Sequence, residues 1–309
     1  MTSPHLRLLG HVDLPAHKGK GGFDHAAVHA TSGHVYVAHT ANDAIDVFDP
    51  ANRQYLYSVP DLPGVAGALV SDESQLIIAS NRAANTIGLF GPGPAPSVRR
   101  IDVGMKPNGL AYDPGRQIVL AANVGDPAIA GSHTLSMVQL GHATTRVEVA
   151  VPGRTRWAVF DPGLALFYVN IMQPAEIVVV DPRRPDRIAQ RFAVPHAGPH
   201  GLDIDSATHR LFCACDAGVL VVLDARSGFV IDERPLSGVP DVVVFNGPRQ
   251  HLYVAIGDPG VIDVFSTSPL ERLATVATEA GAHTTALSPS GDRLYAFLPR
   301  THRAAIYEV

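Results

Sequence analysis

The chain has 309 residues, of which 46% are hydrophobic, and a formal net charge of −5. Such a composition supplies a large apolar core, and the acidic balance excludes the basic surface of a nucleic-acid-binding protein. No run of about 18 apolar residues is present, which excludes a membrane-spanning helix. The first residues, MTSPHLRLLGHVDLP, lack the basic start and long apolar run of a signal peptide. We therefore expect a cytoplasmic protein that binds neither nucleic acid nor membrane.

One short pattern occurs seven times along the chain. Each copy has a small or turn residue, an apolar run, a turn with Asp, Ser or Asn, and a second apolar run. The copies read HAAVHATSGHVYVAH, AGALVSDESQLIIAS, NGLAYDPGRQIVLAA, RWAVFDPGLALFYVN, HGLDIDSATHRLFCAC, DVVVFNGPRQHLYVA and HTTALSPSGDRLYAF. They begin at residues 25, 66, 108, 156, 200, 241 and 283. A repeat of this length, built of short strands, is typical of a β-propeller.

The two ends of the chain are predicted to share one blade. Each interval between copies holds four strand-like runs, but only TTALS, RLYAF and AAIYEV follow His283. The run Leu6–Leu14 belongs to no blade and can supply the missing strand, which would leave no unpaired edge in the ring. The sequence thus predicts an all-β fold, a single domain over residues 1–309. It is a seven-bladed β-propeller of four-stranded blades, with an N-terminal strand closing the last blade.

The two cysteines, Cys213 and Cys215, fall in the predicted strand LFCAC. They share one face of that strand, and no second pair exists to complete a zinc site. We expect them to be buried free thiols, which suits a reducing compartment.

Equivalent positions of the blades converge on the central axis of a propeller. The first residues of the seven copies therefore form a ring, which consists of His25, Ala66, Asn108, Arg156, His200, Asp241 and His283. Blades 5, 6, 7 and 1, which are neighbours in the ring, contribute His, Asp, His and His. The ring is far more polar, and richer in histidine, than chance would give.

This side of the ring predicts a metal site. Imidazole and carboxylate ligands together suit a divalent transition metal such as Zn, Fe, Mn or Ni. We expect His25, His200 and His283 to bind it, with Asp241 as a fourth ligand or as a group that orients a ligand. Ligands from one side of the ring leave a coordination position open, as catalytic sites require.

Three further residues are predicted to act on a substrate. Arg156 and Asn108 lie on the opposite side of the ring, where they could orient a small molecule with an anionic or carbonyl group. His196 precedes His200 by four residues and could serve as a general base or an extra ligand. Trp157, the only tryptophan, is expected to pack between blades. A histidine at this register can also simply bond the backbone of a neighbouring blade, which is the competing structural interpretation.

Several stretches resemble a known family. They are KPNGLAYDPGRQIVLAAN from Lys106, NTIGLF from Asn85, GPHGLDID from Gly198 and SPSGDRLYAF from Ser288. Together they resemble the repeats of YVTN-type seven-bladed propellers, related to YncE-like proteins, over nearly the whole chain. The resemblance implies the fold but little about activity, because such propellers include lactonases, lyases, DNA-binding proteins and proteins without known chemistry.

Two functions remain open from the sequence. The first is a metal-dependent enzyme, a lyase, hydrolase or oxygenase, that acts on a small molecule at the mouth of the propeller channel. The second is a non-catalytic propeller that binds a ligand or a protein through the same face. The substrate and the oligomeric state are not predicted.

Overall fold

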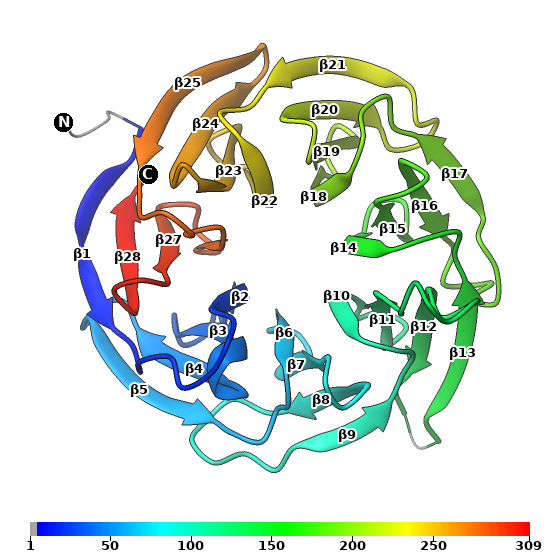
Figure 1. Ribbon diagram of the computed structural model, residues 1–309, viewed down its shortest axis with the longest axis horizontal. Helices are drawn as coiled ribbons and strands as arrows, with labels where there is room; N and C mark the ends of the chain where they lie inside the picture. Colours follow the sequence, from blue (N-terminus) through cyan, green and yellow to red (C-terminus); the bar gives the residue numbers. More distant parts are fainter. Residues whose placement is uncertain (1–4, 142) are drawn as a thin grey trace.

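Seven antiparallel sheets of four strands stand around one axis in the computed structural model (Figure 1), which describes residues 5–141 and 143–309. The predicted all-β seven-bladed propeller is therefore confirmed. A single 3₁₀ turn, η1 (Thr40–Asn42), is the only helical element in these two ranges. No helix of the described chain is long and apolar enough to cross a membrane.

The first four blades follow one another along the chain, each running from the axis outward. Blade 1 holds β2 (Phe23–Val28), β3 (Val35–His39), β4 (Ala44–Asp49) and β5 (Gln54–Val59). Blade 2 holds β6 (Val65–Ser71), β7 (Leu76–Asn81), β8 (Thr86–Phe90) and β9 (Arg99–Asp102). Blade 3 holds β10 (Pro107–Asp113), β11 (Ile118–Asn123), β12 (Thr134–Gln139) and β13 (Thr145–Ala150). Blade 4 holds β14 (Thr155–Asp161), β15 (Leu166–Ile171), β16 (Glu176–Val180) and β17 (Gln190–Ala193).

The last three blades complete the ring and join the chain ends. Blade 5 holds β18 (Pro199–Asp205), β19 (Arg210–Cys215), β20 (Val219–Asp224) and β21 (Val230–Pro235). Blade 6 holds β22 (Val239–Asn246), β23 (His251–Asp258), β24 (Val261–Thr267) and β25 (Leu270–Ala277). Blade 7 holds β26 (Thr285–Leu287), β27 (Arg293–Leu298) and β28 (Arg303–Glu308), and its outer strand is β1 (Arg7–Asp13).

The pairing of β1 with β28 confirms the predicted closure by the N-terminal strand. The two strands are antiparallel, with Arg7 opposite Glu308 and Asp13 opposite Arg303. Leu6 and Val12 are each only 1% exposed, so this segment also fills core space in the last blade and its neighbours. The closure pairs β28 on both sides, with β27 and with β1, so its edge is not exposed.

The core lies between the blades rather than within one central mass. Seven clusters of buried apolar side chains occupy the seven gaps between neighbouring sheets; one joins Phe167 of blade 4 to Leu120 of blade 3. Cys213 and Cys215 are buried in the cluster between blades 4 and 5 as free thiols, as predicted. Such packing leaves the axis itself to the side chains of the innermost strands.

The innermost strands carry a local irregularity at the predicted ring positions. In blade 1 the pairing of the innermost strand with the second strand shifts register between Phe23 and Ala26. Blades 2 to 6 have a register shift at the equivalent place. Each shift contains the ring residue of its blade. A β-bulge re-aims the side chain it carries, so the bulges turn these residues out of the sheets and toward the channel.

Candidate functional site

A polar cavity of about 250 Å³ lies at one mouth of the channel, and we call it the polar mouth. It is lined by Asp24, His25, Arg82, Asn108, Arg154, Arg156, Trp157, His200, Asp241 and His283. Six of the seven predicted ring residues are among them, and Ala66 alone is not. The repeat register therefore brought the polar ring residues together, as the sequence predicted.

His200 is the most strongly oriented side chain in the polar mouth. Its Nδ1 donates a hydrogen bond to Oδ1 of Asp216 at 2.7 Å, which leaves Nε2 directed toward neighbouring charged groups. Asp216 follows β19, so the second strand of blade 5 supplies the carboxylate and its first strand supplies the histidine. Such a carboxylate fixes both the tautomer and the orientation of the imidazole.

The Nε2 atom of His200 lies between a donor and an acceptor. The guanidinium Nη1 of Arg156 donates to it from 3.2 Å, and Oδ1 of Asp241 lies 3.3 Å away. Arg156 favours the unprotonated nitrogen, whereas Asp241 favours the protonated one. Nε2 of His200 therefore faces a hydrogen-bond donor on one side and a carboxylate on the other.

Arg156 is held in place by several weak contacts. Its Nη2 lies 3.4 Å from Oδ2 of Asp216 and donates to Sδ of Met172 at 3.6 Å, while its Nε is buried without a partner. Burial and the charge of Arg154 lower the pKa of Arg156, against the opposing effect of Asp216 and Asp241. An arginine remains cationic under these conditions, so this guanidinium keeps donors for a further anionic partner.

The groups around Asp216 keep its carboxylate ionised. Burial would raise its pKa, but the hydrogen bond from His200 and the charges of His200, Arg156 and Arg154 hold that pKa below its ordinary value. Asp216 is therefore ionised at neutral pH. It keeps the imidazole of His200 oriented over the physiological range.

A second arginine lies on the other side of the polar mouth. Arg82 follows β7 and its Nη2 donates to Oδ1 of Asn108 at 2.5 Å, with Oδ2 of Asp24 3.5 Å away. Its Nε is also buried without a partner. Asn108 thus orients Arg82 and leaves it with an unused donor. Three arginines and two aspartates line the mouth, and Asp216, which contacts both His200 and Arg156, supplies a third carboxylate.

His25 has a different surrounding from the other two ring histidines. Its ring packs on that of Trp157 with 3.9 Å between centroids, and its Nε2 lies 3.4 Å from Oδ1 of Asp24. Burial lowers the pKa of His25, although Asp24 and Asp241 act in the opposite direction. Trp157 packs in part against the core between blades 4 and 5, as expected, and in addition forms this stack in the channel.

The predicted metal ligands come together at the mouth without forming a recognisable metal centre. The carboxylate of Asp241 lies between two imidazoles, 3.3 Å from Nε2 of His200 and 3.9 Å from Nε2 of His283. Nδ1 of His283 bonds the carbonyl oxygen of Gly281 at 2.8 Å. Within residues 5–141 and 143–309, no group of three or more His, Cys, Asp or Glu side chains is arranged to hold a metal ion. The metal therefore stays a prediction.

The structure places His196 away from the other predicted residues. Its Nε2 lies 3.0 Å from Oε2 of Glu233 on β21, the outer strand of blade 5, and it does not line the polar mouth. His196 lies in the bend between β17 and β18, and its pairing with Glu233 holds it on the outer strand of blade 5, away from the ring.

Four functional residues were missed from the sequence: Asp24, Arg82, Arg154 and Asp216. Arg82 and Asp216 share a signal, because each directly follows the second strand of its blade. Antiparallel pairing brings that position next to the start of the innermost strand, as in the Pro199–Cys215 pair. The repeats therefore predict a second ring of side chains, formed by the residue that follows the second strand of each blade.

Comparisons with known proteins identify the fold alone. No family model and no curated protein matches the chain. Among solved structures, it is similar to the Kuenenia stuttgartiensis hydrazine synthase, with a TM-score of 0.81, 12% identity and 97% of each chain covered. It is also similar to a chain of the mitotic checkpoint complex, with a TM-score of 0.78 and 10% identity over 98% of this chain and 91% of that one.

Proposed function

We propose that the polar mouth binds a small molecule with an anionic group and that His200 exchanges a proton with it. The observation that carries this proposal is the Asp216–His200–Arg156 arrangement. The carboxylate of Asp216 orients the imidazole of His200, and Nε2 of that imidazole accepts a hydrogen bond from the guanidinium of Arg156 at 3.2 Å. Base and anion-binding group would thus contact the same ligand.

The chemistry follows from the roles of these groups. Arg156 and Arg82 would bind the anionic end of the substrate, since a guanidinium can donate two parallel hydrogen bonds to a carboxylate or phosphate. His200 would then take a proton from the bound molecule, and Asp241 would stabilise the imidazolium that results. Proton removal next to a carboxylate begins many lyase reactions, and the same base could activate a water for hydrolysis. We therefore favour a lyase or hydrolase of small organic acids.

Anion binding is the first part to test. Isothermal titration with oxalate, malonate and phosphate should give measurable binding to the wild-type protein. Arg156→Ala should weaken it at least tenfold, and Arg156→Lys should weaken it less because one positive charge is kept. Arg183→Ala is the matched control, since that exposed arginine pairs with Asp181 on the surface. Equal affinities for wild type and Arg156→Ala would refute the assignment.

Proton exchange is the second part. A panel of 2-oxo and 3-oxo acids incubated with the protein in D₂O should include one whose carbon-bound protons disappear from the NMR spectrum. His200→Gln keeps the shape but removes the base, so the exchange should stop. Asp216→Asn should slow it by about 10²- to 10⁴-fold, because the tautomer of His200 is no longer fixed.

A metal-dependent enzyme is the second candidate. It is favoured by the position of Asp241, whose oxygens lie 3.3 and 3.9 Å from Nε2 of His200 and His283. Ligand atoms around a tetrahedral zinc lie about 3.4 Å apart, given bonds of about 2.1 Å. Elemental analysis after addition and removal of excess Zn, Fe, Mn or Ni tests this. Stoichiometric metal that is lost in His283→Ala would support it.

The non-catalytic alternative uses the same surface. A protein that binds the anions through Arg156, exchanges no proton on any member of the panel and retains no metal would be a ligand-binding propeller. The resemblance to YVTN-type propellers is compatible with either outcome and stays a prediction.

A further inference from the structure

A second cavity of about 690 Å³ occupies the channel on the other side of the His25–Trp157 stack, and we call it the apolar chamber. Both stacked residues line both cavities, so they form the boundary between them. The chamber lies within the range of about 300–1,000 Å³ that is usual for small-molecule sites. Its walls come from the innermost strands of all seven blades, beyond the bulges.

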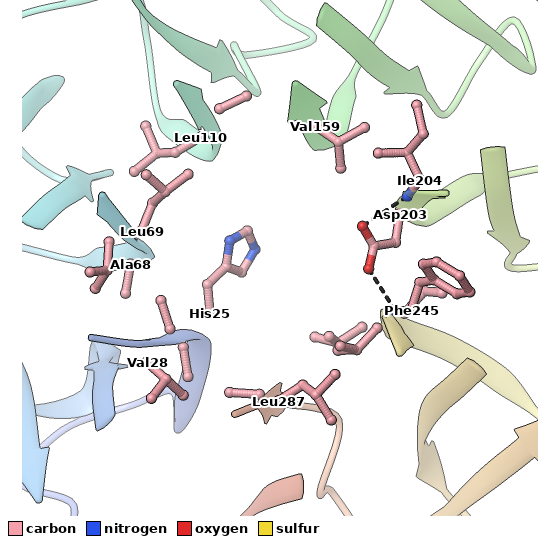
Figure 2. Close-up of a pocket in the computed structure, with 18 of the residues that line it drawn as sticks. His25, Val28, Ala68, Leu69, Leu110, Val159, Asp203, Ile204, Phe245 and Leu287 are labelled. Atoms are coloured by element: carbon pink, nitrogen blue, oxygen red, sulfur yellow. Dashed lines mark hydrogen bonds between the residues drawn. The ribbon is translucent and has the colours of Figure 1, made fainter. Parts of the chain in front are cut away.

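Aliphatic side chains from several blades make up most of the side-chain lining of the apolar chamber. Figure 2 shows Val28, Leu69, Leu110, Val159 and Leu287 around the opening, contributed by five different blades. No lysine or arginine within residues 5–141 and 143–309 lines it. The surface is suited to an apolar body, whose burial would release water from these side chains.

One carboxylate interrupts this apolar wall. Asp203 lies on β18, and its carboxyl group points into the chamber across from the imidazole of His25 (Figure 2). Oδ1 accepts a hydrogen bond from the backbone N–H of Ile204 at 2.8 Å, and Oδ2 accepts one from Phe245 at 2.6 Å. Each oxygen can accept a second hydrogen bond, so both retain a free position toward the cavity.

Asp203 has no cationic partner within 4 Å in the described part of the chain. The arginines of the channel lie at the polar mouth, beyond the His25–Trp157 stack. Among the residues that the structure describes, two other titratable side chains line the chamber: His25, whose pKa is lowered by burial, and Tyr112, whose hydroxyl contacts that of Ser74 at 3.1 Å. A carboxylate in apolar surroundings is stabilised most by a charge-assisted hydrogen bond from a cation, and here a ligand would have to supply it.

We propose that the apolar chamber is a second small-molecule site, which takes a hydrophobic amine with its ammonium group on Asp203 and its hydrocarbon body against the opposite walls. The ligand class follows from one acid in a cavity whose other side chains are mostly aliphatic. The site does not depend on the polar mouth or on the reaction proposed there.

A matched set of probes tests the ligand class. Adamantylmethylamine, adamantylmethanol and adamantanecarboxylate share one apolar body and differ in charge. Their binding can be followed at pH 7.5 through the emission of Trp157, the only tryptophan of the protein, which lines the chamber. The amine should bind at least tenfold more tightly than the alcohol, and the carboxylate should bind most weakly. Equal affinities for amine and alcohol, or no binding of the amine, would overturn the proposal without any variant.

Variants locate the bound amine. Asp203→Asn should abolish the preference for the amine over the alcohol, and Val159→Phe should weaken both by filling the chamber. Asp241→Asn alters only the polar mouth, and Asp13→Asn removes an exposed carboxylate on β1, so both should leave the amine affinity unchanged. Amine binding that survives Asp203→Asn and Val159→Phe but is lost in Asp241→Asn would place the ligand at the polar mouth and refute the assignment.

Discussion

The rings of His25 and Trp157 pack against each other across the channel in a tilted arrangement, with 3.9 Å between ring centroids and an interplanar angle of 34°, although they come from blades 1 and 4. Inner strands from distant blades rarely meet at the axis of a propeller, because the channel separates them. This contact therefore divides the channel into a charged half and an apolar half. Because Trp157 lines both halves, the fluorescence of this single tryptophan can report ligand binding in either one.

The stack predicts how the emission of Trp157 responds to pH. Burial lowers the pKa of His25 from its ordinary value of 6.5, so the imidazole in contact with the indole is neutral at pH 7. Protonation below that pKa places a cation against the indole and should quench it. A titration from pH 8 to pH 4 should show one quenching step with its midpoint below 6.5. His25→Gln should remove the step, and a midpoint above 6.5 would contradict the predicted direction.

A division of roles is predicted within the polar mouth. Arg156→Ala should weaken anion binding or raise KM and leave any bound metal in place, because a guanidinium is not a ligand. His283→Ala should instead lose metal and activity together if a metal is present. Elemental analysis and kinetics on the same protein samples distinguish the two. Full activity in Arg156→Ala, together with retained metal in His283→Ala, would contradict this division and favour the non-catalytic alternative.

Because the innermost strands of neighbouring blades pack closely, adding one methyl group at Gly201 is predicted to lower the stability of the protein strongly. A Cβ added at Gly201 would lie 2.1 Å from the carbonyl oxygen of Asp241, on the neighbouring blade. Gly201→Ala must push blades 5 and 6 apart, and overpacking of this kind costs about 1–3 kcal/mol or more. Thermal unfolding should show a clear fall in Tm. Gly91→Ala is the control, because the only atom near its Cβ is 4.0 Å away; equal Tm values for the two variants would argue against the close approach.

The closure by β1 predicts that the N-terminal segment is needed for stability. Removal of residues 1–14 takes away Leu6 and Val12, which are buried, and exposes the edge of β28. The truncated protein should aggregate or lose much of its thermal stability. Leu8→Ser is a milder control on the same strand, since Leu8 is 44% exposed. A truncated protein that melts like the full-length chain would disprove the role of this closure.

How far the sequence predicts the site depends on where each residue lies in the repeat. The fold and the ring were predictable because equivalent positions of seven copies converge, and His200, Asp241 and His283 follow that rule. Asp216 and Arg82 were missed because they lie in the loops after the second strands of their blades, outside the positions that converge by repeat register. Asp203 was missed for another reason. In a strand with alternating faces a polar residue is usually taken as solvent-exposed, whereas Asp203 lines the apolar chamber. No periodicity shows that His196 turns toward Glu233, because loop geometry decides it.

Asp203 predicts an unusual dependence of stability on pH. Burial raises the pKa of this carboxyl to about 6, against the effect of the hydrogen bonds from Phe245 and Ile204. In the unfolded chain the same group has a pKa of about 3.9. Between these values the folded state binds more protons than the unfolded state, so this group makes the free energy of unfolding fall as pH rises from about 4 to about 6. The full effect is at most about 3 kcal/mol, since one pKa unit corresponds to about 1.4 kcal/mol.

Urea unfolding of wild type and Asp203→Asn at a series of pH values isolates this contribution. Asn keeps the size of the side chain but does not titrate, so the stability difference between the two proteins should change steadily between pH 4 and pH 6 and stay constant above about 7. His25 acts in the opposite direction, because its lowered pKa removes stability as pH falls below 6.5, but it is present in both proteins and cancels in the difference. The variant also loses the hydrogen bond from Phe245. This loss changes the stability difference between the two proteins by the same amount at every pH, so the dependence of that difference on pH is unchanged. A difference that is flat from pH 4 to pH 7 would mean that Asp203 ionises normally. The apolar chamber would then not desolvate its only acid.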